Sequence, residues 1–195
     1  MSKQIIMDSH SDLNKKLNVA HINLCTTAEG PFKRMAIWFQ GCDILCKGCC
    51  NPELQPIKHA HIMTVSEIVN IAIDSRDKYN IEGITFLGGE PTLQINLHIL
   101  SSELKKNNFG IILFTGKILK QLSTDLVNKV DAVVDGEFQY NNLDADRNLI
   151  GSQNQKIHFV SERYVDQLNW FYNYRRKIVE MNLNSQDLFI SGDTI

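Results

Sequence analysis

Short apolar runs that alternate with helical patterns constrain the fold of this chain most. Three such runs lie at 84–87, 111–114 and 130–135, and the leucines between the first two recur at helical spacing, at Leu93, Leu97, Leu100 and Leu104. Nearly continuous apolar strands are buried on both faces, which is typical of a parallel sheet joined by right-handed crossovers. The pattern predicts an α/β fold with a parallel sheet and outer helices.

Further elements are expected on both sides of this region. Strands are predicted at 18–24, 34–40 and 156–160, a short helix around 118–122, and a helix with an apolar face over 164–172. Thr64 and Glu67 have the spacing of a capping box, which begins a helix that runs to about Tyr79. Runs at 177–182 and 188–191 flank Asn184-Ser185 as a terminal hairpin. Residues 1–17 are polar and aperiodic and are expected to form a flexible tail, which leaves one domain at 18–195.

Length and charge exclude several classes of protein. A chain of 195 residues suits a single domain with a hydrophobic core. The net charge is −2 and the basic residues are scattered, so we expect no nucleic-acid partner. No run of about 18 apolar residues is present for a membrane span, and the first residues lack the apolar core of a signal peptide. We therefore expect no membrane association and a location in the cytoplasm.

Four of the five cysteines lie between positions 42 and 50, and the first three, Cys42, Cys46 and Cys49, are spaced C-x3-C-x2-C. In a reducing compartment, clustered cysteines are more often metal ligands than disulfides. A 4Fe-4S cluster normally takes four cysteines, so three ligands leave one iron without a protein ligand. Open metal positions generally mark chemistry rather than scaffolding. The spacing predicts a catalytic iron–sulfur site.

Other interpretations of the cysteines remain open. Cys50 is a doubtful fourth ligand, because the peptide bond from Cys49 limits its freedom to turn toward the same cluster, and Cys25 is interpreted as a small buried hydrophobic residue. A zinc site would need four ligands, which His59 and His61 would complete, but the usual second cysteine pair is missing. We interpret both histidines as solvated loop residues.

The cysteine loop followed by Gly88-Gly89-Glu90-Pro91 resembles the radical S-adenosylmethionine enzymes. Within that family the chain is similar to the activating-enzyme branch, especially to the activases of anaerobic ribonucleotide reductase. The similar stretches span most of residues 20–160 and lie at 27–31, 38–42, 49–52, 114–116, 134–136 and 151–155.

The resemblance implies a partial, open (βα)6-type barrel that binds a 4Fe-4S cluster and S-adenosylmethionine. It also implies that the open iron chelates the cofactor and that one electron cleaves it to a 5′-deoxyadenosyl radical. That radical would abstract hydrogen from a glycine of a large glycyl radical enzyme, with an electron donor such as flavodoxin and under anoxia. No catalytic residue beyond the cluster ligands is expected.

The resemblance also implies which residues hold the cofactor. Gly89 and Glu90 would hold its amino group, since a carboxylate accepts from an ammonium group, and Gly88 is a further cofactor contact because glycines allow a ligand to approach closely. The remaining expected contacts are Thr115, Gly116 and Lys117 near the ribose or carboxylate, and Gly48, Cys49 and Cys50 near the adenine. Gly48 stands where many radical enzymes carry an aromatic residue, so adenine stacking is expected from elsewhere. Asp135 would anchor a cofactor hydroxyl or the substrate loop, or would cap a turn.

Two other functions remain open at this point. One is radical modification of a small molecule or peptide, which uses the same cofactor chemistry on a different substrate. The other is a metal-binding adaptor without turnover, which would form no 5′-deoxyadenosine from S-adenosylmethionine and a strong reductant.

Overall fold

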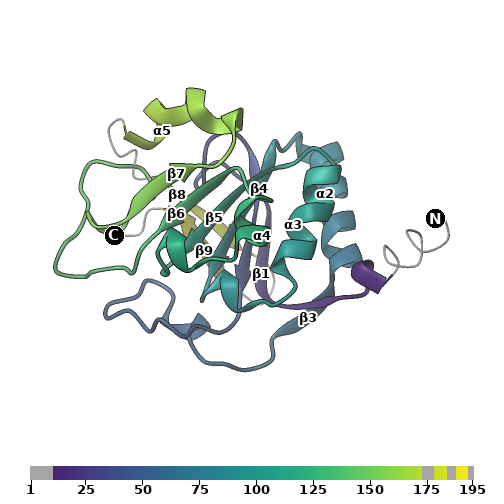
Figure 1. Ribbon diagram of the computed structural model, residues 1–195, viewed down its shortest axis with the longest axis horizontal. Helices are drawn as coiled ribbons and strands as arrows, with labels where there is room; N and C mark the ends of the chain where they lie inside the picture. Colours follow the sequence, from purple (N-terminus) through teal and green to yellow (C-terminus); the bar gives the residue numbers. More distant parts are fainter. Residues whose placement is uncertain (1–10, 173–177, 184–187, 193–195) are drawn as a thin grey trace.

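A seven-stranded sheet forms the centre of the protein (Figure 1). The computed structural model describes residues 11–172, 178–183 and 188–192. In spatial order the strands are β3-β1-β2-β4-β5-β6-β7. Their bounds are β1 (Lys16–Thr26), β2 (Arg34–Phe39), β3 (His61–Thr64), β4 (Gly83–Gly88), β5 (Gly110–Thr115), β6 (Ala132–Asp135) and β7 (Lys156–Phe159).

The four central strands, β2, β4, β5 and β6, pair in parallel, whereas β1, β3 and β7 pair antiparallel at the two sides. The predicted α/β class with a parallel sheet and outer helices is confirmed. The antiparallel direction of the outer strands is a feature that the apolar runs did not predict. The sequence of a short apolar strand does not reveal whether it runs parallel or antiparallel to its neighbour. The direction depends on the connection before the strand, since antiparallel strands can be joined by a short turn and parallel strands need a longer crossover.

Two helices, α2 (Val65–Tyr79) and α3 (Leu97–Lys106), lie side by side on one face of the sheet (Figure 1). The predicted capping box is present: the Thr64 hydroxyl accepts from the Glu67 N–H, and the Glu67 carboxylate accepts from the Thr64 N–H at 2.7 Å. The remaining helices are short: η1 (Pro52–Leu54), η2 (Pro91–Leu93), η3 (Leu119–Gln121), α4 (Thr124–Val127), η4 (Glu162–Gln167) and α5 (Leu168–Tyr172).

Successive side chains of the central strands point to opposite faces of the sheet, because side chains alternate along a strand. One set packs under α2 and α3 in the main hydrophobic core and includes Ile37, Phe39, Ile84, Phe86, Ile111 and Leu113. The alternate set faces the other side of the sheet, where Trp38, Leu87 and Phe114 line a cavity. The same apolar strands thus build both the core and a candidate site.

A buried charge network joins the amino ends of these strands. Arg34 is fully buried, and its guanidinium donates to the Glu82 carboxylate at 2.9 Å, to the Tyr164 hydroxyl at 2.7 Å and to the Thr85 hydroxyl at 2.7 Å. The Tyr164 hydroxyl in turn donates to Glu82 at 2.6 Å, and burial raises the pKa of Tyr164. A buried charge is tolerated when it is paired and hydrogen-bonded in this way. The network closes the end of the sheet opposite the cysteines.

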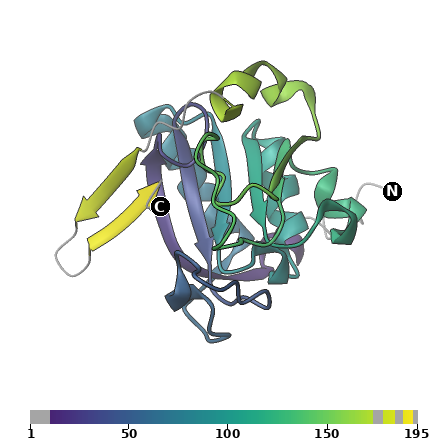
Figure 2. The same ribbon diagram turned by 90° about the vertical axis from the view of Figure 1, so that its left-hand side faces the viewer.

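A separate two-stranded sheet, β8 (Val179–Leu183) paired antiparallel with β9 (Leu188–Gly192), projects from the body of the protein (Figure 2). These strands agree with the predicted terminal hairpin, and the turn predicted at 184–185 lies outside the described residues. Of the expected tail, residues 1–10 lie outside them too, while β1 begins at Lys16. None of the helices described is both long and apolar enough to cross a membrane.

Candidate functional site

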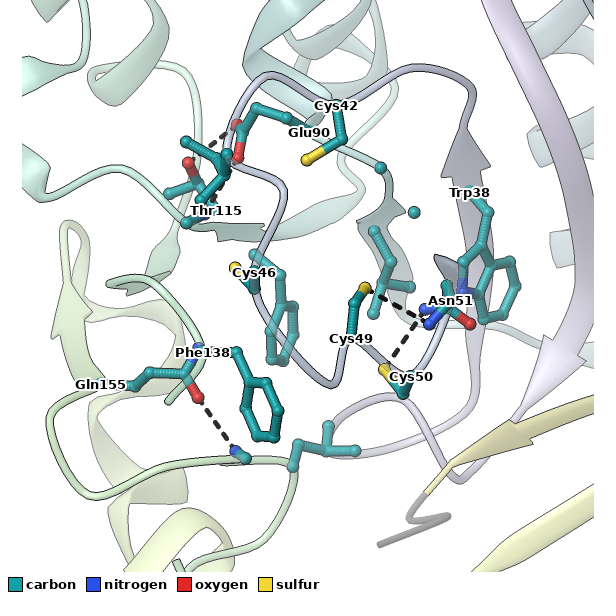
Figure 3. A pocket seen from close by; sticks show the side chains of 18 of the residues that line it. Trp38, Cys42, Cys46, Cys49, Cys50, Asn51, Glu90, Thr115, Phe138 and Gln155 are labelled. Atoms are coloured by element: carbon teal, nitrogen blue, oxygen red, sulfur yellow. Dashed lines mark hydrogen bonds between the residues drawn. The ribbon is translucent and has the colours of Figure 1, made fainter. Parts of the chain in front are cut away.

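A cavity of about 560 Å³ opens where the carboxyl ends of the central strands meet (Figure 3). Parallel strands end at the same edge of a sheet, so loops that are distant in the sequence come together there. Four segments contribute most of the wall. They include Cys42, Cys46, Cys49 and Cys50 of the cysteine loop, Gly88, Gly89 and Glu90 at the end of β4, Thr115 and Gly116 at the end of β5, and Gly136 and Phe138 after β6.

The cysteine loop is closed at its base by main-chain hydrogen bonds. The Gly41 N–H donates to the Leu54 carbonyl at 2.9 Å, and the Cys42 N–H donates to the Gln55 carbonyl at 3.0 Å. Gly41 has a φ of +97°, a conformation that glycine adopts without strain, so the chain can turn sharply out of β2. Residues 41–55 therefore form a loop whose two ends are held together by the protein itself.

The three cysteines of the C-x3-C-x2-C motif all line the cavity as free thiols. Burial raises the pKa of the Cys46 thiol, and its hydrogen bond with the backbone of Phe138 lowers that pKa in part. A hydrogen bond with the adjacent Cys50 thiol lowers the pKa of Cys49 to about 6. The Asn51 N–H also donates to the Cys49 sulfur, at 3.4 Å. Because metals bind the thiolate form, this environment prepares Cys49 as a ligand.

The loop after β4 packs directly against the entrance of the cysteine loop. The Gly89 N–H donates to the Phe39 carbonyl at 2.9 Å and the Glu90 N–H to the Gly41 carbonyl at 2.8 Å. A Cβ on Gly89 would lie 2.1 Å from the Gly41 oxygen, and one on Gly88 would lie 2.3 Å from the Phe39 nitrogen. Close approach of backbone to backbone therefore accounts for the two glycines. The approach of a ligand to these glycines stays a prediction, since both also line the cavity.

Glu90 connects the loops after β4 and β5. It is buried, and Oε1 accepts from the Thr115 hydroxyl at 2.8 Å and from the Thr92 N–H at 3.0 Å, while Oε2 accepts from the Gly116 N–H at 2.9 Å (Figure 3). Hydrogen bonds to a charged group are stronger than those between neutral groups, so this carboxylate holds the two loops in register. Glu90, Thr115 and Gly116 form one hydrogen-bonded unit in the cavity wall.

Three residues predicted to contact a cofactor do not line the cavity: Gly48, Lys117 and Asp135. Lys117 lies 3.5 Å from the carboxylate of Asp43. Asp135 accepts from the Leu119 N–H at 2.6 Å at the start of η3, a turn-capping contact. A Cβ on Gly48 would lie 2.6 Å from the Tyr140 ring, so an aromatic residue covers this position from another loop.

That other loop, between β6 and β7, contributes a further wall of the cavity. Phe138, Leu149, Gly151 and Gln155 all line it. The Gln155 side chain accepts from the Gly151 N–H at 3.0 Å and donates to the Gly136 carbonyl at 2.9 Å, which ties the two ends of the loop together (Figure 3). The predicted match at 151–155 thus falls on a segment that folds the loop back toward the cysteines.

Several cavity residues had not been predicted individually: Trp38, Phe114, Phe138, Glu29 and Ser191. The positions of Trp38 and Phe114 follow from the strand period, since each alternates with core residues near the carboxyl end of its strand. Phe138 carries no such pattern, because it lies in an irregular loop. The two polar residues reach the cavity from distant segments, which no local pattern reveals.

The donor set fits an iron–sulfur cluster better than a zinc ion. Cys25 lies in β1 against the hydrophobic core, and His59 and His61 are exposed and do not line the cavity. In the part of the chain that the structure describes, no three or more His, Cys, Asp or Glu side chains gather around a single ion position. A tetrahedral zinc site needs four ligands about 2.0–2.3 Å from one atom, and neither histidine reaches the cavity to complete such a set beside the three cysteines of the motif.

Comparison with known proteins gives independent findings. Residues 28–158 match the family model described as a 4Fe-4S single cluster domain. Two proteins named anaerobic ribonucleoside-triphosphate reductase-activating protein are similar to this chain. The protein of phage T4 is 28% identical over 149 residues, which cover 72% of this chain and 93% of the relative. The protein of Vibrio cholerae is 29% identical over 138 residues, which cover 66% of this chain and 89% of the relative.

Two further proteins are similar over part of the chain. The pyruvate formate-lyase-activating enzyme of Staphylococcus aureus is 36% identical over 93 residues, which cover 46% of this chain and 37% of the relative. Among solved structures, QueE from Escherichia coli superposes with a TM-score of 0.50 at 14% identity and covers 69% of this chain and 76% of that one. This second likeness shows the fold alone.

Proposed function

The chain belongs to the 4Fe-4S single cluster domain family, and from this premise we propose that it is a radical S-adenosylmethionine enzyme of the activating type. The observation that carries the proposal is the cavity itself, in which three thiols spaced C-x3-C-x2-C face the Glu90, Thr115 and Gly116 unit. The relatives named as activating proteins support the same function.

Cys42, Cys46 and Cys49 would hold a 4Fe-4S cluster, and the rest of the cavity would hold S-adenosylmethionine. When bound, the cluster supplies the electron that cleaves the cofactor and so starts hydrogen abstraction. A cavity of about 560 Å³ lies within the usual range for small-molecule sites, roughly 300–1,000 Å³. Its wall combines aromatic side chains with a few polar groups, the composition that such sites generally show.

The residues of the chain then position the ligands rather than react themselves. Glu90 fixes the Thr115 hydroxyl and the Gly116 N–H at one side of the cavity, and its packing on Gly41 couples that side to the cysteine loop. Trp38, Leu87 and Phe114 make the floor apolar and limit the access of water. Exclusion of water protects reactive species from side reactions.

We further propose that the substrate is a glycine of a partner glycyl radical enzyme, specifically an anaerobic ribonucleotide reductase. The names of the phage T4 and Vibrio cholerae relatives, each covered over most of its length, support this choice. The free thiols support a location in the reducing cytoplasm, where an electron donor such as flavodoxin would serve.

Two measurements test the proposal in sequence. Anaerobically reconstituted protein should form 5′-deoxyadenosine from S-adenosylmethionine and dithionite, and addition of the anaerobic reductase from the same source should give the doublet of a glycyl radical in the EPR spectrum. Absence of 5′-deoxyadenosine would refute the enzymatic function. Formation of 5′-deoxyadenosine without the doublet would refute the partner and favour a small molecule or peptide as substrate.

A further inference from the structure

The loop between β6 and β7 holds a leucine in a left-handed backbone conformation. Leu149 has a φ of +62°. An L side chain rarely adopts this conformation, because its Cβ comes too close to the following carbonyl oxygen. Non-glycine residues that are held in this way occur mainly at active sites and ligand clamps, where the surrounding structure imposes the strain. The strained conformation of Leu149 therefore points to a role beyond making a turn.

Other residues with a positive φ show what a turn by itself requires. Among the residues that the structure describes, five besides the glycines have a positive φ. Asn80 and Asn108 follow the ends of α2 and α3, and asparagine tolerates this conformation well. Phe32 and Leu45 are apolar, but they are 52% and 61% exposed and neither residue lines the cavity. Leu149 is the one of the five that lines the cavity.

The residues beside Leu149 fix its backbone. Asn148 is buried, and its N–H donates to the Phe171 carbonyl at 2.9 Å, while its side-chain amide donates to the Trp170 carbonyl. Ile150, on the other side, is fully buried. Both neighbours are thus anchored in the body of the protein, so the loop cannot relax the conformation of Leu149 between them.

Phe138 belongs to the same loop and lines the same cavity (Figure 3). A Cβ on Gly151 would lie 2.8 Å from the Phe138 ring, so the ring packs on the backbone close to Leu149. Leu149 and Phe138 therefore give the cavity an apolar wall. The hydrogen-bonded unit that Glu90 forms with the end of β5 gives it a separate, polar wall.

The chemistry of S-adenosylmethionine matches these two walls. Its amino-acid end carries an ammonium group and a carboxylate, which need polar partners. Its adenine is a planar base, and every base has a π-face that stacks on aromatic side chains. When the polar end lies at the Glu90 unit, the adenosine is accommodated best by the apolar wall of Leu149 and Phe138.

We propose that Leu149, together with Phe138, contacts the adenosine of bound S-adenosylmethionine, and that the loop between β6 and β7 keeps a strained backbone at Leu149 to present this side chain. The inference rests on the proposed function and assigns a specificity-determining contact to it. Glycine or asparagine would fit the backbone of position 149 with less strain. Either residue would leave the adenosine without its apolar contact, which explains why a leucine is present.

The test measures the affinity of the anaerobically reconstituted full chain for S-adenosylmethionine by equilibrium dialysis, with the cluster left oxidised so that no electron is available for cleavage. Leu149→Asn tolerates the positive φ but lacks the apolar side chain, so its affinity should fall by at least about fivefold, the value of a partly buried leucine side chain. Leu149→Met keeps the apolar contact and should bind within about threefold of wild type. Phe32→Asn is the matched control, since Phe32 has a φ of +64° away from the cavity, and its affinity should be unchanged.

The urea midpoint of unfolding, measured without the ligand, separates ligand contact from a structural role. Because asparagine relieves the backbone strain, the midpoint of Leu149→Asn should be unchanged or higher while its affinity falls. A midpoint that falls together with the affinity would overturn the inference, and so would an equal loss of affinity in Phe32→Asn. Wild-type protein that does not bind S-adenosylmethionine would refute the proposed function, and this inference with it. Equal binding by the wild type and by Leu149→Asn would refute the inference alone.

Discussion

Gly89→Ala tests whether the loop after β4 holds the cysteine loop in place through backbone contact. The new Cβ would lie 2.1 Å from the Gly41 oxygen and 2.8 Å from the Leu54 oxygen. Both neighbours are main-chain atoms, so no side chain can rotate away and the two loops must separate. Gly89 does not have a positive φ, so the effect is steric and involves no change in backbone preference.

The magnitude follows from the contacts that would be lost. Overpacking of this kind costs about 1–3 kcal/mol. Separation of the loops also weakens the hydrogen bonds from Gly89 to Phe39 and from Glu90 to Gly41, each with a net value of about 0.5–1.5 kcal/mol. The free energy of unfolding should therefore fall by about 2–6 kcal/mol, and the melting temperature by roughly 4–24 °C for a chain of this length.

Urea unfolding under anoxia, together with iron content after reconstitution, measures both consequences. Gly116→Ala is the matched control, because the three atoms nearest its Cβ would all belong to the Ile44 side chain, the closest at 3.0 Å, and that side chain can move. Gly116→Ala should cost less than about 1 kcal/mol and should retain its iron. A Gly89→Ala protein as stable as the Gly116→Ala protein would refute the steric argument, and full iron content would refute the coupling between the loops.

Three further predictions concern single side chains. Cys46→Ala should abolish both the brown absorbance of the cluster and cofactor cleavage, whereas Cys25→Ala, which packs against the core, should retain both. Cluster binding by Cys46→Ala would contradict the ligand assignment. Arg34→Met should lower the free energy of unfolding by about 1–3 kcal/mol, because the buried Ile84 and Gly110 carbonyls lose the guanidinium that donates to them, while Glu82 keeps its ion pair with Arg163; an unchanged free energy in urea unfolding would contradict this. Burial raises the pKa of Asp144, but hydrogen bonds from Arg147 and Asp146 outweigh it and leave the pKa below its usual value. The stabilisation that Asp144 provides is therefore present above the unfolded pKa of about 3.9 and is lost as the pH falls through the lower folded pKa. Asp144→Asn should have a lower free energy of unfolding than wild type at pH 7, and the two proteins should become equally stable in acid. A difference in free energy that is the same at pH 7 and in acid would refute the linkage.

The elements that sequence patterns predicted best are those whose signals are local. The capping box at Thr64 and Glu67 correctly predicted where α2 begins, and the helix ends at Tyr79 as expected. Both ends were predictable because each is determined by residues within one turn of the helix. The leucine pattern from Leu93 predicted a helix that in fact begins at Leu97. Pro91 and the Glu90 side chain, which accepts from the Thr92 N–H, form a separate 3-10 turn before it.

Functional residues were predictable where a motif carried them and not where the fold assembled them. The cysteine spacing placed Cys42, Cys46 and Cys49 on one loop, and the structure places all three on one cavity wall. Ser191 lies far from them in the sequence, and only the position of β9 brings it to that wall. The packing of Gly89 on Gly41 had no local signal, because a missing Cβ looks the same in a sequence whether a ligand or a backbone occupies the space.

The main-chain bonds from Gly41 to Leu54 and from Cys42 to Gln55 bear on how the protein matures. They close the base of the cysteine loop with no metal involved, unlike small zinc domains, which fold only when the metal binds. We therefore expect iron and sulfide to bind to a polypeptide that has already folded. Damage by oxygen would then be repairable in place, by refilling the same loop without refolding the chain.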